Sequence, residues 1–307
     1  MKRLRLVPQE TAYDFIRLRW IGFVVSLLFM VATVGVIVQE GINFGIDFTG
    51  GILMEVRTPE PTTLQVFRDV LDRPEFGEVS LQHFGDDREV LIRIQTSDTE
   101  EQAALVEEAK DILEAEMPAL EYRKIDYVGP TVGQELIQSG YLSLGVAFAA
   151  VLMYIWFRFE WQFGVGAVVA LLHDAFIMVG FFALTRFDFG LTSIAAILTV
   201  IGYSINDSVV IYDRIRENLR KYKKMPLTEV LNRSINDTLS RTVMTGVTTI
   251  LAAGALAVFG GEVLKGFSWA LVFGVVVGTY SSVFVAAPIL LYFGIRNEQD
   301  ETAPAAS

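Results

Sequence analysis

The chain has 307 residues, of which 52 % are hydrophobic and only 20 % are charged, and its formal net charge is −11. A typical soluble domain carries about 25 % charged residues, so this composition excludes a soluble enzyme and predicts a membrane protein. The negative charge argues against a nucleic-acid binder, because phosphate binding needs an excess of Lys and Arg. The absence of cysteine excludes a disulfide scaffold, a thiolate metal site and a thiol nucleophile.

Six apolar blocks of about 20 residues each match the length that a helix needs to cross roughly 30 Å of hydrocarbon. They are Trp20–Val38, Gly140–Phe157, Phe163–Thr185, Phe189–Tyr212, Thr242–Gly261 and Phe267–Ile295. We interpret the first block, transmembrane helix 1 over residues 20–38, as a retained signal anchor because no A-x-A-like cleavage site follows it. Helices 2–6 are predicted within residues 139–295, which gives a polytopic α-helical fold.

Lys and Arg are concentrated in alternate connections between these blocks. Five precede the first block and seven lie in residues 213–240, between the fourth and fifth blocks. The positive-inside rule therefore places residues 1–19, the basic loop 213–240 and the tail 296–307 in the cytoplasm. The basic loop either contacts anionic membrane lipid or serves only as this orientation signal. Both termini are therefore expected inside.

The remaining large loop, residues 39–138, is predicted to be an extracytoplasmic α+β domain. It holds 8 Lys/Arg and 22 Asp/Glu, a net charge of −14. Strands are predicted over 52–56, 79–84, 89–94 and 120–128, with helices over 62–71, behind a Thr cap, and from a cap at Ser97/Asp98 to about Glu116. The order βαββαβ is typical of a ferredoxin-like domain, which by itself names no ligand.

Two ionisable residues are predicted to lie at similar depth in the membrane. Asp207 precedes the end of the fourth block by five residues, and Arg241 opens the antiparallel fifth block. An intramembrane charge needs a partner or a hydrated cavity. The pair is either a static salt bridge or a proton-loaded carboxylate that is switched by movement of Arg241. Thr245, Thr248 and Thr249 either hydrate a path beside it or bond to their own helix backbone.

Three further ionisable residues are candidates for parts of a relay. His173-Asp174 lies midway through the third block and is either a helix–helix hydrogen bond or a second relay position. Asp213, at the water boundary, is interpreted as an interface anchor that pairs with Arg216, with an accessory relay as the alternative. One His and one Asp are too few for a metal site, and no cofactor is expected.

The sixth block repeats small residues every four positions: Gly274, Gly278, Ser282 and Ala286. Such a face predicts tight helix packing, either within the chain or against another subunit. The common nucleophile, nucleotide and zinc motifs are absent from the sequence, and we therefore expect no enzyme activity.

Several motifs together resemble the SecF family, the smaller membrane subunits of the bacterial SecDF protein-export complex, in the resistance-nodulation-division superfamily. They are Gly45-Ile-Asp-Phe-Thr-Gly-Gly51, Thr131-Val-Gly-Gln-Glu-Leu136, His173-Asp174, Ile201-Gly-Tyr-Ser-Ile-Asn-Asp207 and Tyr212-Asp-Arg-Ile-Arg-Glu-Asn218. The resemblance covers about residues 15–295.

The resemblance implies an accessory subunit of the Sec translocase in the bacterial cytoplasmic (inner) membrane, with residues 39–138 in the periplasm. Its partners would be SecD, the SecYEG channel, SecA indirectly, and a translocating unfolded polypeptide. The proton-motive force would drive completion of export, with Asp207 and Arg241 as the proton-passage residues and Asp174 and Asp213 as accessory candidates. H⁺ is the expected coupling ion, with Na⁺ left open. The alternatives are a small-molecule or lipid efflux transporter of the same superfamily and a non-conducting scaffold.

Overall fold

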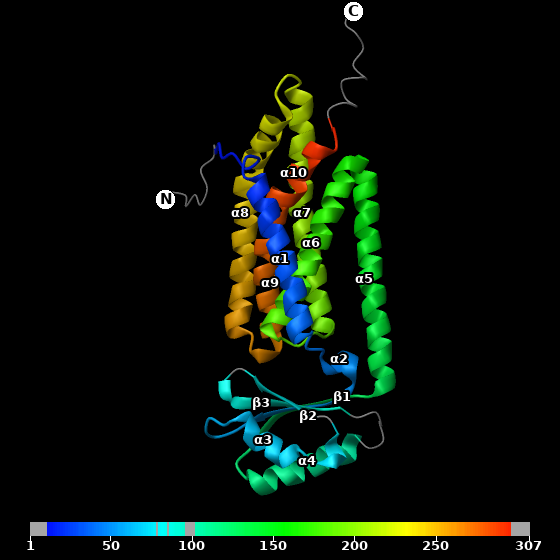
Figure 1. The fold of residues 1–307 in the computed structure, drawn as a ribbon, viewed down its shortest axis with the longest axis vertical. Helices are drawn as coiled ribbons and strands as arrows, with labels where there is room; N and C mark the ends of the chain where they lie inside the picture. Colours follow the sequence, from blue (N-terminus) through cyan, green and yellow to red (C-terminus); the bar gives the residue numbers. More distant parts are fainter. Residues whose placement is uncertain (1–10, 78, 85, 96–101, 296–307) are drawn as a thin grey trace, which may run out of the picture. The chain divides into compact units, whose positions relative to one another are not determined.

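The computed structural model describes residues 11–77, 79–84, 86–95 and 102–295 (Figure 1). The predicted cap at Ser97/Asp98 and the tail 296–307 lie outside these residues. The chain forms two compact units. One unit is helical, and the other consists of Asn43–Ser143 together with the short segment Asp188–Thr192.

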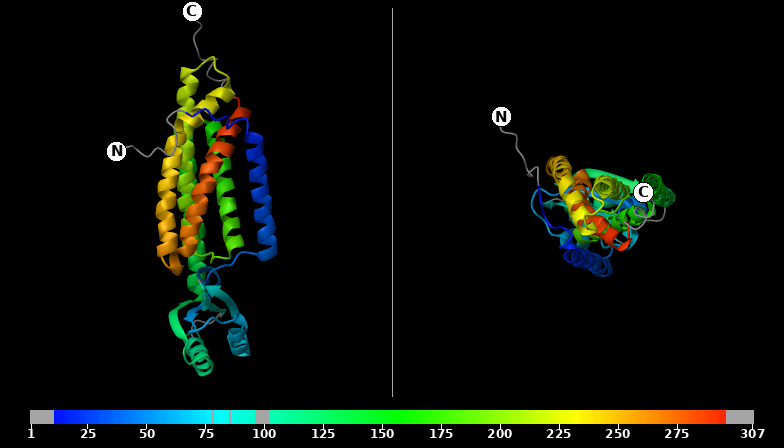
Figure 2. Two further views of the ribbon diagram at one scale, coloured as in Figure 1. Left: turned by 90° about the vertical axis from the view of Figure 1, so that its left-hand side faces the viewer. Right: turned by 90° about the horizontal axis from the view of Figure 1, so that it is seen from above.

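The described residues contain six helices that are long and apolar enough to cross a membrane, as predicted. Their bounds are α1 (Arg19–Glu40), α5 (Pro130–Arg158), α6 (Trp161–Thr185), α7 (Leu191–Lys221), α8 (Leu227–Phe259) and α9 (Glu262–Ser281). The sixth crossing continues beyond α9 to Tyr292. The most buried spans are α6, α7 and this sixth crossing, which therefore make up the core of the helical unit (Figure 2).

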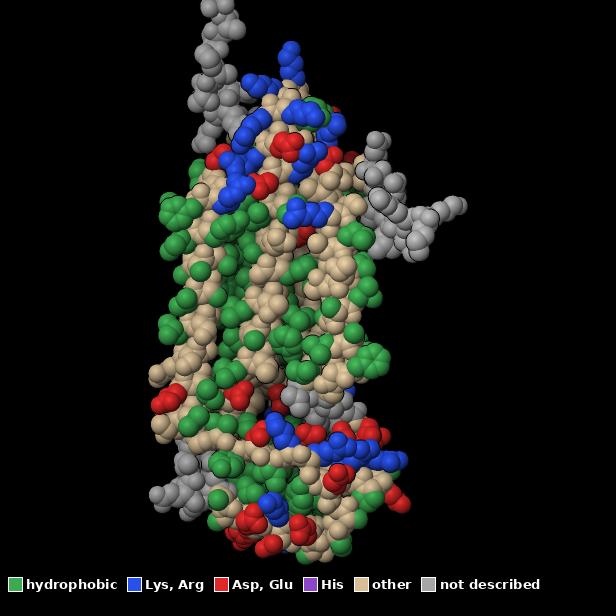
Figure 3. Space-filling view, turned by 180° about the vertical axis from the view of Figure 1, so that it is seen from behind, with side chains coloured by type: hydrophobic (Ala, Val, Ile, Leu, Met, Phe, Trp, Pro, Cys, Tyr) green, Lys and Arg blue, Asp and Glu red, His purple; other side chains and the backbone are tan. Residues whose placement is uncertain are grey.

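The segment predicted as the basic loop 213–240 is mostly helical. Helix α7 continues to Lys221 and α8 begins at Leu227, so only a few residues connect them. Arg214 links the two extensions through an ion pair with Asp237 (2.8 Å), and Asn218 Nδ2 donates to Ser234 Oγ (3.0 Å). In Figure 3, hydrophobic side chains cover the length of the helices, and Lys and Arg gather at the end with the α7–α8 connection.

The sixth crossing is interrupted near Pro288. Five residues, Ser282–Ala286, form a π-helical turn, followed by α10 (Ala287–Ile289) and a 3₁₀ turn, Leu290–Tyr292. The amide of Ala287 donates to the carbonyl of Ser282, five residues earlier. Proline has no N–H and its ring clashes with the carbonyl four residues before it, so a widened turn relieves the conflict ahead of Pro288.

The small face of the sixth crossing packs against α7, which settles the choice between intrachain and intersubunit packing in favour of the former. A Cβ on Gly274 would lie 2.2 Å from Val200 Cγ2, and one on Gly278 would lie 3.0 Å from Ser204 Cβ. Further along both helices, Ser282 Oγ is 2.9 Å from Ser208 Oγ. The Tyr212 hydroxyl donates to the carbonyl of Ala286 (3.1 Å). The contacts between the two helices therefore recur every four residues, at four successive positions.

The second unit has the predicted element order βαββαβ. It consists of β1 (Gly51–Arg57), α3 (Leu64–Leu71), β2 (Val79–Phe84), β3 (Asp86–Ile94), α4 (Gln102–Glu116) and β4 (Glu121–Val128). The strand order is β2-β3-β1-β4 and every neighbouring pair is antiparallel. The inward side chains of β1 and β3, with Phe67, Leu71 and Leu113 from the helices, form its hydrophobic core.

Three local features of this unit differ from the prediction. Helix α3 begins at Leu64, and its N-cap residue Thr63 makes no side-chain capping bond, so the predicted Thr cap is wrong. A one-turn helix, α2 (Ile46–Thr49), precedes β1, and a 3₁₀ turn, Pro74–Phe76, follows α3. Both short elements end beside glycines with positive φ, Gly50 and Gly77, a backbone conformation that glycine adopts without steric cost.

Candidate functional site

Asp207 lies on α7 in the core of the helical unit, with 4 % of its surface exposed. The Thr242 hydroxyl, on α8, donates to Asp207 Oδ1 over 2.7 Å. The second carboxylate oxygen, Oδ2, is buried and has no hydrogen-bond partner among the described residues. Buried polar groups are nearly always bonded, so an unpartnered carboxylate oxygen at this depth is an unusual feature that calls for an explanation.

Arg241 does not form the ion pair that the depth argument left open. Its side chain is exposed, and the ion pairs found within 4.0 Å among the described residues do not include Asp207 with Arg241. Successive residues on a helix point about 100° apart. Because Thr242 faces α7, the preceding residue is directed away around α8. Sequence reasoning therefore missed Thr242, the hydrogen-bond partner of Asp207.

The three threonines after Thr242 follow the simpler of the two interpretations. Thr245, Thr248 and Thr249 each donate to the backbone carbonyl four residues earlier, over 3.0, 3.0 and 2.8 Å respectively. Their hydroxyls are therefore satisfied within α8 and do not line up toward Asp207.

Asp174 is fully buried and, unlike Asp207, is satisfied at both oxygens. Oδ2 accepts from Ser204 Oγ (2.5 Å) on α7 and from Ser281 Oγ (2.7 Å) at the end of α9. Oδ1 is 2.9 Å from Nδ1 of the adjacent His173. The carboxylate therefore joins three helices, which extends the predicted helix–helix hydrogen bond to two further helices.

Asp213 lies near the end of the helical unit that carries the α5–α6 turn. Arg158 Nη2 donates to both of its oxygens over 2.6 Å. The predicted partner, Arg216, is at 4.0 Å. With its side chain 41 % exposed, Asp213 has the contacts of an anchor. Among the described residues, no hydrogen bond connects Asp213 with Asp207, because Asp213 bonds to Arg158 and Asp207 bonds to Thr242.

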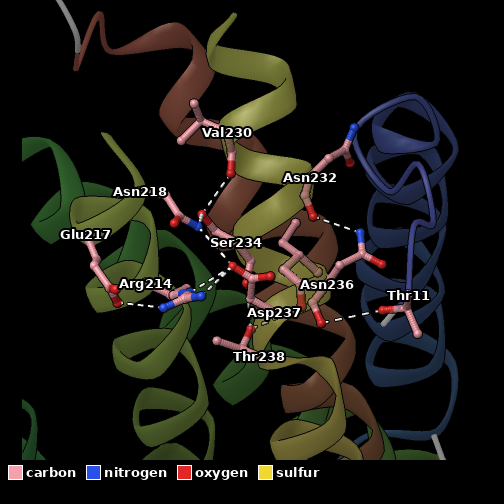
Figure 4. Close-up of polar contacts among 11 residues, drawn as sticks. Thr11, Arg214, Glu217, Asn218, Val230, Asn232, Ser234, Asn236, Asp237 and Thr238 are labelled. Atoms are coloured by element: carbon pink, nitrogen blue, oxygen red, sulfur yellow. Dashed lines mark hydrogen bonds and ion pairs between the residues drawn. The ribbon is translucent and has the colours of Figure 1, made fainter. Parts of the chain in front are cut away.

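The extensions of α7 and α8 form a further polar cluster, shown in Figure 4. Here the segment before α1 lies along α8, because two asparagines one turn apart bind its backbone. Asn232 Oδ1 accepts from the amide of Ile16 (2.9 Å), and Asn236 bonds both the amide and the carbonyl of Tyr13 (2.9 and 2.8 Å). This contact fixes the start of α1 to α8.

Sequence reasoning missed the hydroxyl partners of the buried carboxylates. Thr242 follows Arg241 directly, and Ser204 and Ser208 flank Asp207 on α7. Small hydroxyl residues close in sequence to an intramembrane ionisable residue are the signal that could have identified these partners. Ser281 could not be found this way, because only the packing of helices distant in sequence brings it to Asp174. Among the described residues, no group of three or more His, Cys, Asp or Glu could hold a metal ion.

These features define a multi-pass helical membrane protein that carries buried carboxylates in its bundle core and a small α+β domain between its first two crossings. Residues 108–296 match the family described as "Protein export membrane protein SecD/SecF, C-terminal", and residues 35–58 match the "SecD/SecF GG Motif". The chain belongs to the SecD/SecF family.

Similar proteins agree with this assignment. Protein translocase subunit SecF of Rickettsia bellii (strain OSU 85-389) is 48 % identical over 291 residues, which cover 94 % of this chain and 96 % of the relative. SecF of Rickettsia conorii is also 48 % identical over 291 residues, 94 % of each chain.

Two solved structures are similar over nearly the whole chain. The crystal structure of SecDF, a translocon-associated membrane protein from Thermus thermophilus, has a TM-score of 0.84 at 35 % identity and matches 95 % of this chain. SecDF in a super-membrane-facing form has a TM-score of 0.68 at 35 % identity and matches 97 %. The present chain covers only 40 and 41 % of these two SecDF chains.

Proposed function

We propose that this chain works as the SecF half of a SecDF complex, which uses the proton-motive force to complete the export of secreted proteins. The related subunits are named as parts of a protein translocase. The SecF relatives are matched over 96 and 94 % of their own length, whereas the SecDF chain is matched over 40 %. By analogy with these SecF subunits, SecD would be a separate subunit. The complex would act in the bacterial inner membrane beside the SecYEG channel, after the SecA step, on an unfolded polypeptide.

The observation that carries the ion-driven part of this proposal is the unequal bonding of Asp207. Its Oδ1 is held by Thr242 while Oδ2 is buried and unpartnered. One oxygen thus fixes the position of the carboxyl group and leaves the other able to take up a proton. Asp174, by contrast, has hydroxyl or imidazole partners at both oxygens, so it serves as a structural centre.

Arg241 is suited to discharge this site, since it is one residue before Thr242 and makes no ion pair with Asp207 here. A rotation of α8 that brings the guanidinium toward Oδ2 would favour the ionised carboxylate and release the proton. Rotation back would favour uptake. In this scheme, Thr242 positions the carboxyl and Arg241 sets its charge. H⁺ is the coupling ion.

The test is the release of a secreted precursor from inverted membrane vesicles that contain SecD and either the wild-type chain or Asp207→Asn. We expect the variant to assemble with SecD, as checked by co-purification, but to lose stimulation of release by the proton-motive force. Asp69→Asn is the matched control, because this exposed carboxylate on α3 bonds to Gln65 Nε2 over 2.6 Å. The control should release precursor normally.

Normal release by Asp207→Asn would refute the ion-coupling scheme and leave a non-conducting scaffold. Replacing H⁺ by a Na⁺ gradient provides a second arm of the same assay. If only the Na⁺ gradient stimulates release, the coupling ion is Na⁺ and Asp207 remains the proposed ion-binding residue.

A further inference from the structure

The short connection between α6 and α7 forms one compact unit with the α+β domain. We call the contacting residues the joint: residues 43–51 before and at the start of β1, Arg93 on β3, and residues 188–191. These residues are far apart in the sequence, since the contact between Leu191 and Asp47 closes over 144 residues. The joint includes the glycine-rich motif Gly45–Gly51, which the proposed ion pathway does not use.

Asp47 binds the first residue of α7. Its Oδ2 accepts from the backbone amide of Leu191 over 3.0 Å. The first amides of a helix have no partner within the helix, and the helix dipole favours a negative charge at this end. The neighbouring Gly190 makes the approach possible, because a Cβ there would lie 2.5 Å from Asp47 Oδ2.

Arg93 forms the second connection. Its Nη1 donates to Asn43 Oδ1 over 2.7 Å, and its Nη2 forms an ion pair with Asp188. Asn43 Nδ2 also donates to Asp188 Oδ1 over 3.1 Å. Arg93 is 8 % exposed, whereas the side chain of Asp188 is 40 % exposed. The guanidinium is therefore buried while its carboxylate partner is partly open to water, and the charge-assisted hydrogen bonds hold the guanidinium in one geometry.

The backbone completes the joint. The amide of Gly45 donates to the carbonyl of Phe189 (3.0 Å), and the amide of Phe189 donates to the carbonyl of Asn43 (2.8 Å). Phe44 and Phe189 thereby form a parallel β-bridge. Gly51 then starts β1 at φ +104°, where a Cβ would lie 2.5 Å from the carbonyl oxygen of Ile94. The motif therefore serves to place the backbone against α7's first residues and against β3.

We propose that Asp47 and Arg93 are positioning residues that transmit movement of α7 to the α+β domain. The proposal rests on the proposed function, because α7 also carries Asp207. Sixteen residues separate Leu191 from Asp207, a rise of about 24 Å along one continuous helix. An α-helix transmits axial displacement well, so a shift at the carboxylate reaches Leu191, where Asp47 and Arg93 hold the domain.

The experiment separates transmission from ion movement in proteoliposomes that contain SecD and the SecYEG channel. We expect Asp47→Ala to keep the ion uptake that depends on Asp207. Stimulation of precursor release should fall about five-fold, the effect expected when a helix loses one N-terminal capping interaction. Asp47→Asn keeps a hydrogen-bond acceptor and should lose less. Asp69→Ala, which removes an exposed carboxylate outside the joint, should change neither readout.

A disulfide provides a rescue that a merely structural role of Asp47 would not show. The chain has no native cysteine, and bridged β-residues lie at a Cα separation suitable for a disulfide. Phe44→Cys with Phe189→Cys, added to Asp47→Ala, should restore release when oxidised and lose it again when reduced.

Normal release by Asp47→Ala, while Asp207→Asn is inactive, would overturn the joint and leave the proposed function intact. Parallel loss of ion uptake, release and assembly, without rescue by the disulfide, would also overturn it in favour of a structural role. Normal release by Asp207→Asn instead marks failure of the proposed function, and the joint proposal then fails with it.

Discussion

Gly274 offers a direct test of the packing between α7 and the sixth crossing. A Cβ at this position would lie 2.2 and 2.7 Å from the two γ carbons of Val200 and 3.0 Å from its Cβ. Carbon atoms pack best at about 3.5–4.0 Å, so the helices must separate by at least about 1.3 Å in Gly274→Ala. Rotating Val200 gives no relief, because both γ carbons are too close and β-branched side chains have one preferred helical rotamer.

The expected cost follows from comparison with a second glycine. Gly202 lies on the same helix as Val200, and a Cβ there would meet no atom within 4 Å. Gly202→Ala and Gly274→Ala gain the same helix propensity, but only the latter overpacks the core. We therefore expect Gly274→Ala to be less stable than Gly202→Ala by about 1–3 kcal/mol. The 2.9 Å contact between Ser208 and Ser282 would be stretched in the same variant.

Unfolding in mixed detergent micelles, followed by the fluorescence of the chain's four tryptophans, measures this difference. Val200→Ala removes both γ carbons, so the double variant Val200→Ala/Gly274→Ala should recover stability, with a coupling of about 0.5–3 kcal/mol. Equal stability of the two single glycine variants, or additivity in the double variant, would refute the packing argument.

Two further predictions concern buried polar groups. Asp174→Asn replaces an acceptor of two serine hydroxyls and one imidazole by an amide. It should lower the free energy of unfolding by about 1–3 kcal/mol in the same micelle assay, and an unchanged value would contradict the assigned network. Burial, with smaller contributions from nearby carboxylates, raises the pKa of Tyr122 from 10.0 to about 12. The stability from this protonated phenol should be complete below about pH 10 and disappear as the pH rises through 12. The difference in phenolate absorbance between wild type and Tyr122→Phe checks this, and a step near pH 10 would contradict it.

The parts of the fold that sequence predicted correctly rest on local signals. The lengths of the apolar runs predict six crossings, alternation predicts the βαββαβ order, and spacing of four predicts the small face of the sixth crossing. Each depends on residues within about twenty positions of one another. The π-helical turn also has a local sequence signal, Pro288.

The contacts of the site depend on how helices are rotated against one another, which depth arguments leave undetermined. Asp207 and Arg241 are at related depths, but a rotation of one residue places Thr242 against the carboxylate instead. The sequence predicts that Asp213 pairs with Arg216, but its main partner is Arg158 on another helix. Sequence thus located the ionisable residues but could not assign their partners, because those partners come from other helices.

The joint also has a consequence for the order in which the chain is made. Its two sides, Asp47 and Leu191, are separated by 144 residues, so at about 5–20 residues per second the ribosome needs about 7–30 s to synthesise the second after the first. The last strand of the domain ends at Val128, and the sheet is therefore complete before residues 188–191 exist. Asp47 and Arg93 therefore have no partners from residues 188–191 until α5 and α6 have been synthesised. Closure of the joint is a late step of biogenesis that follows synthesis of the third crossing.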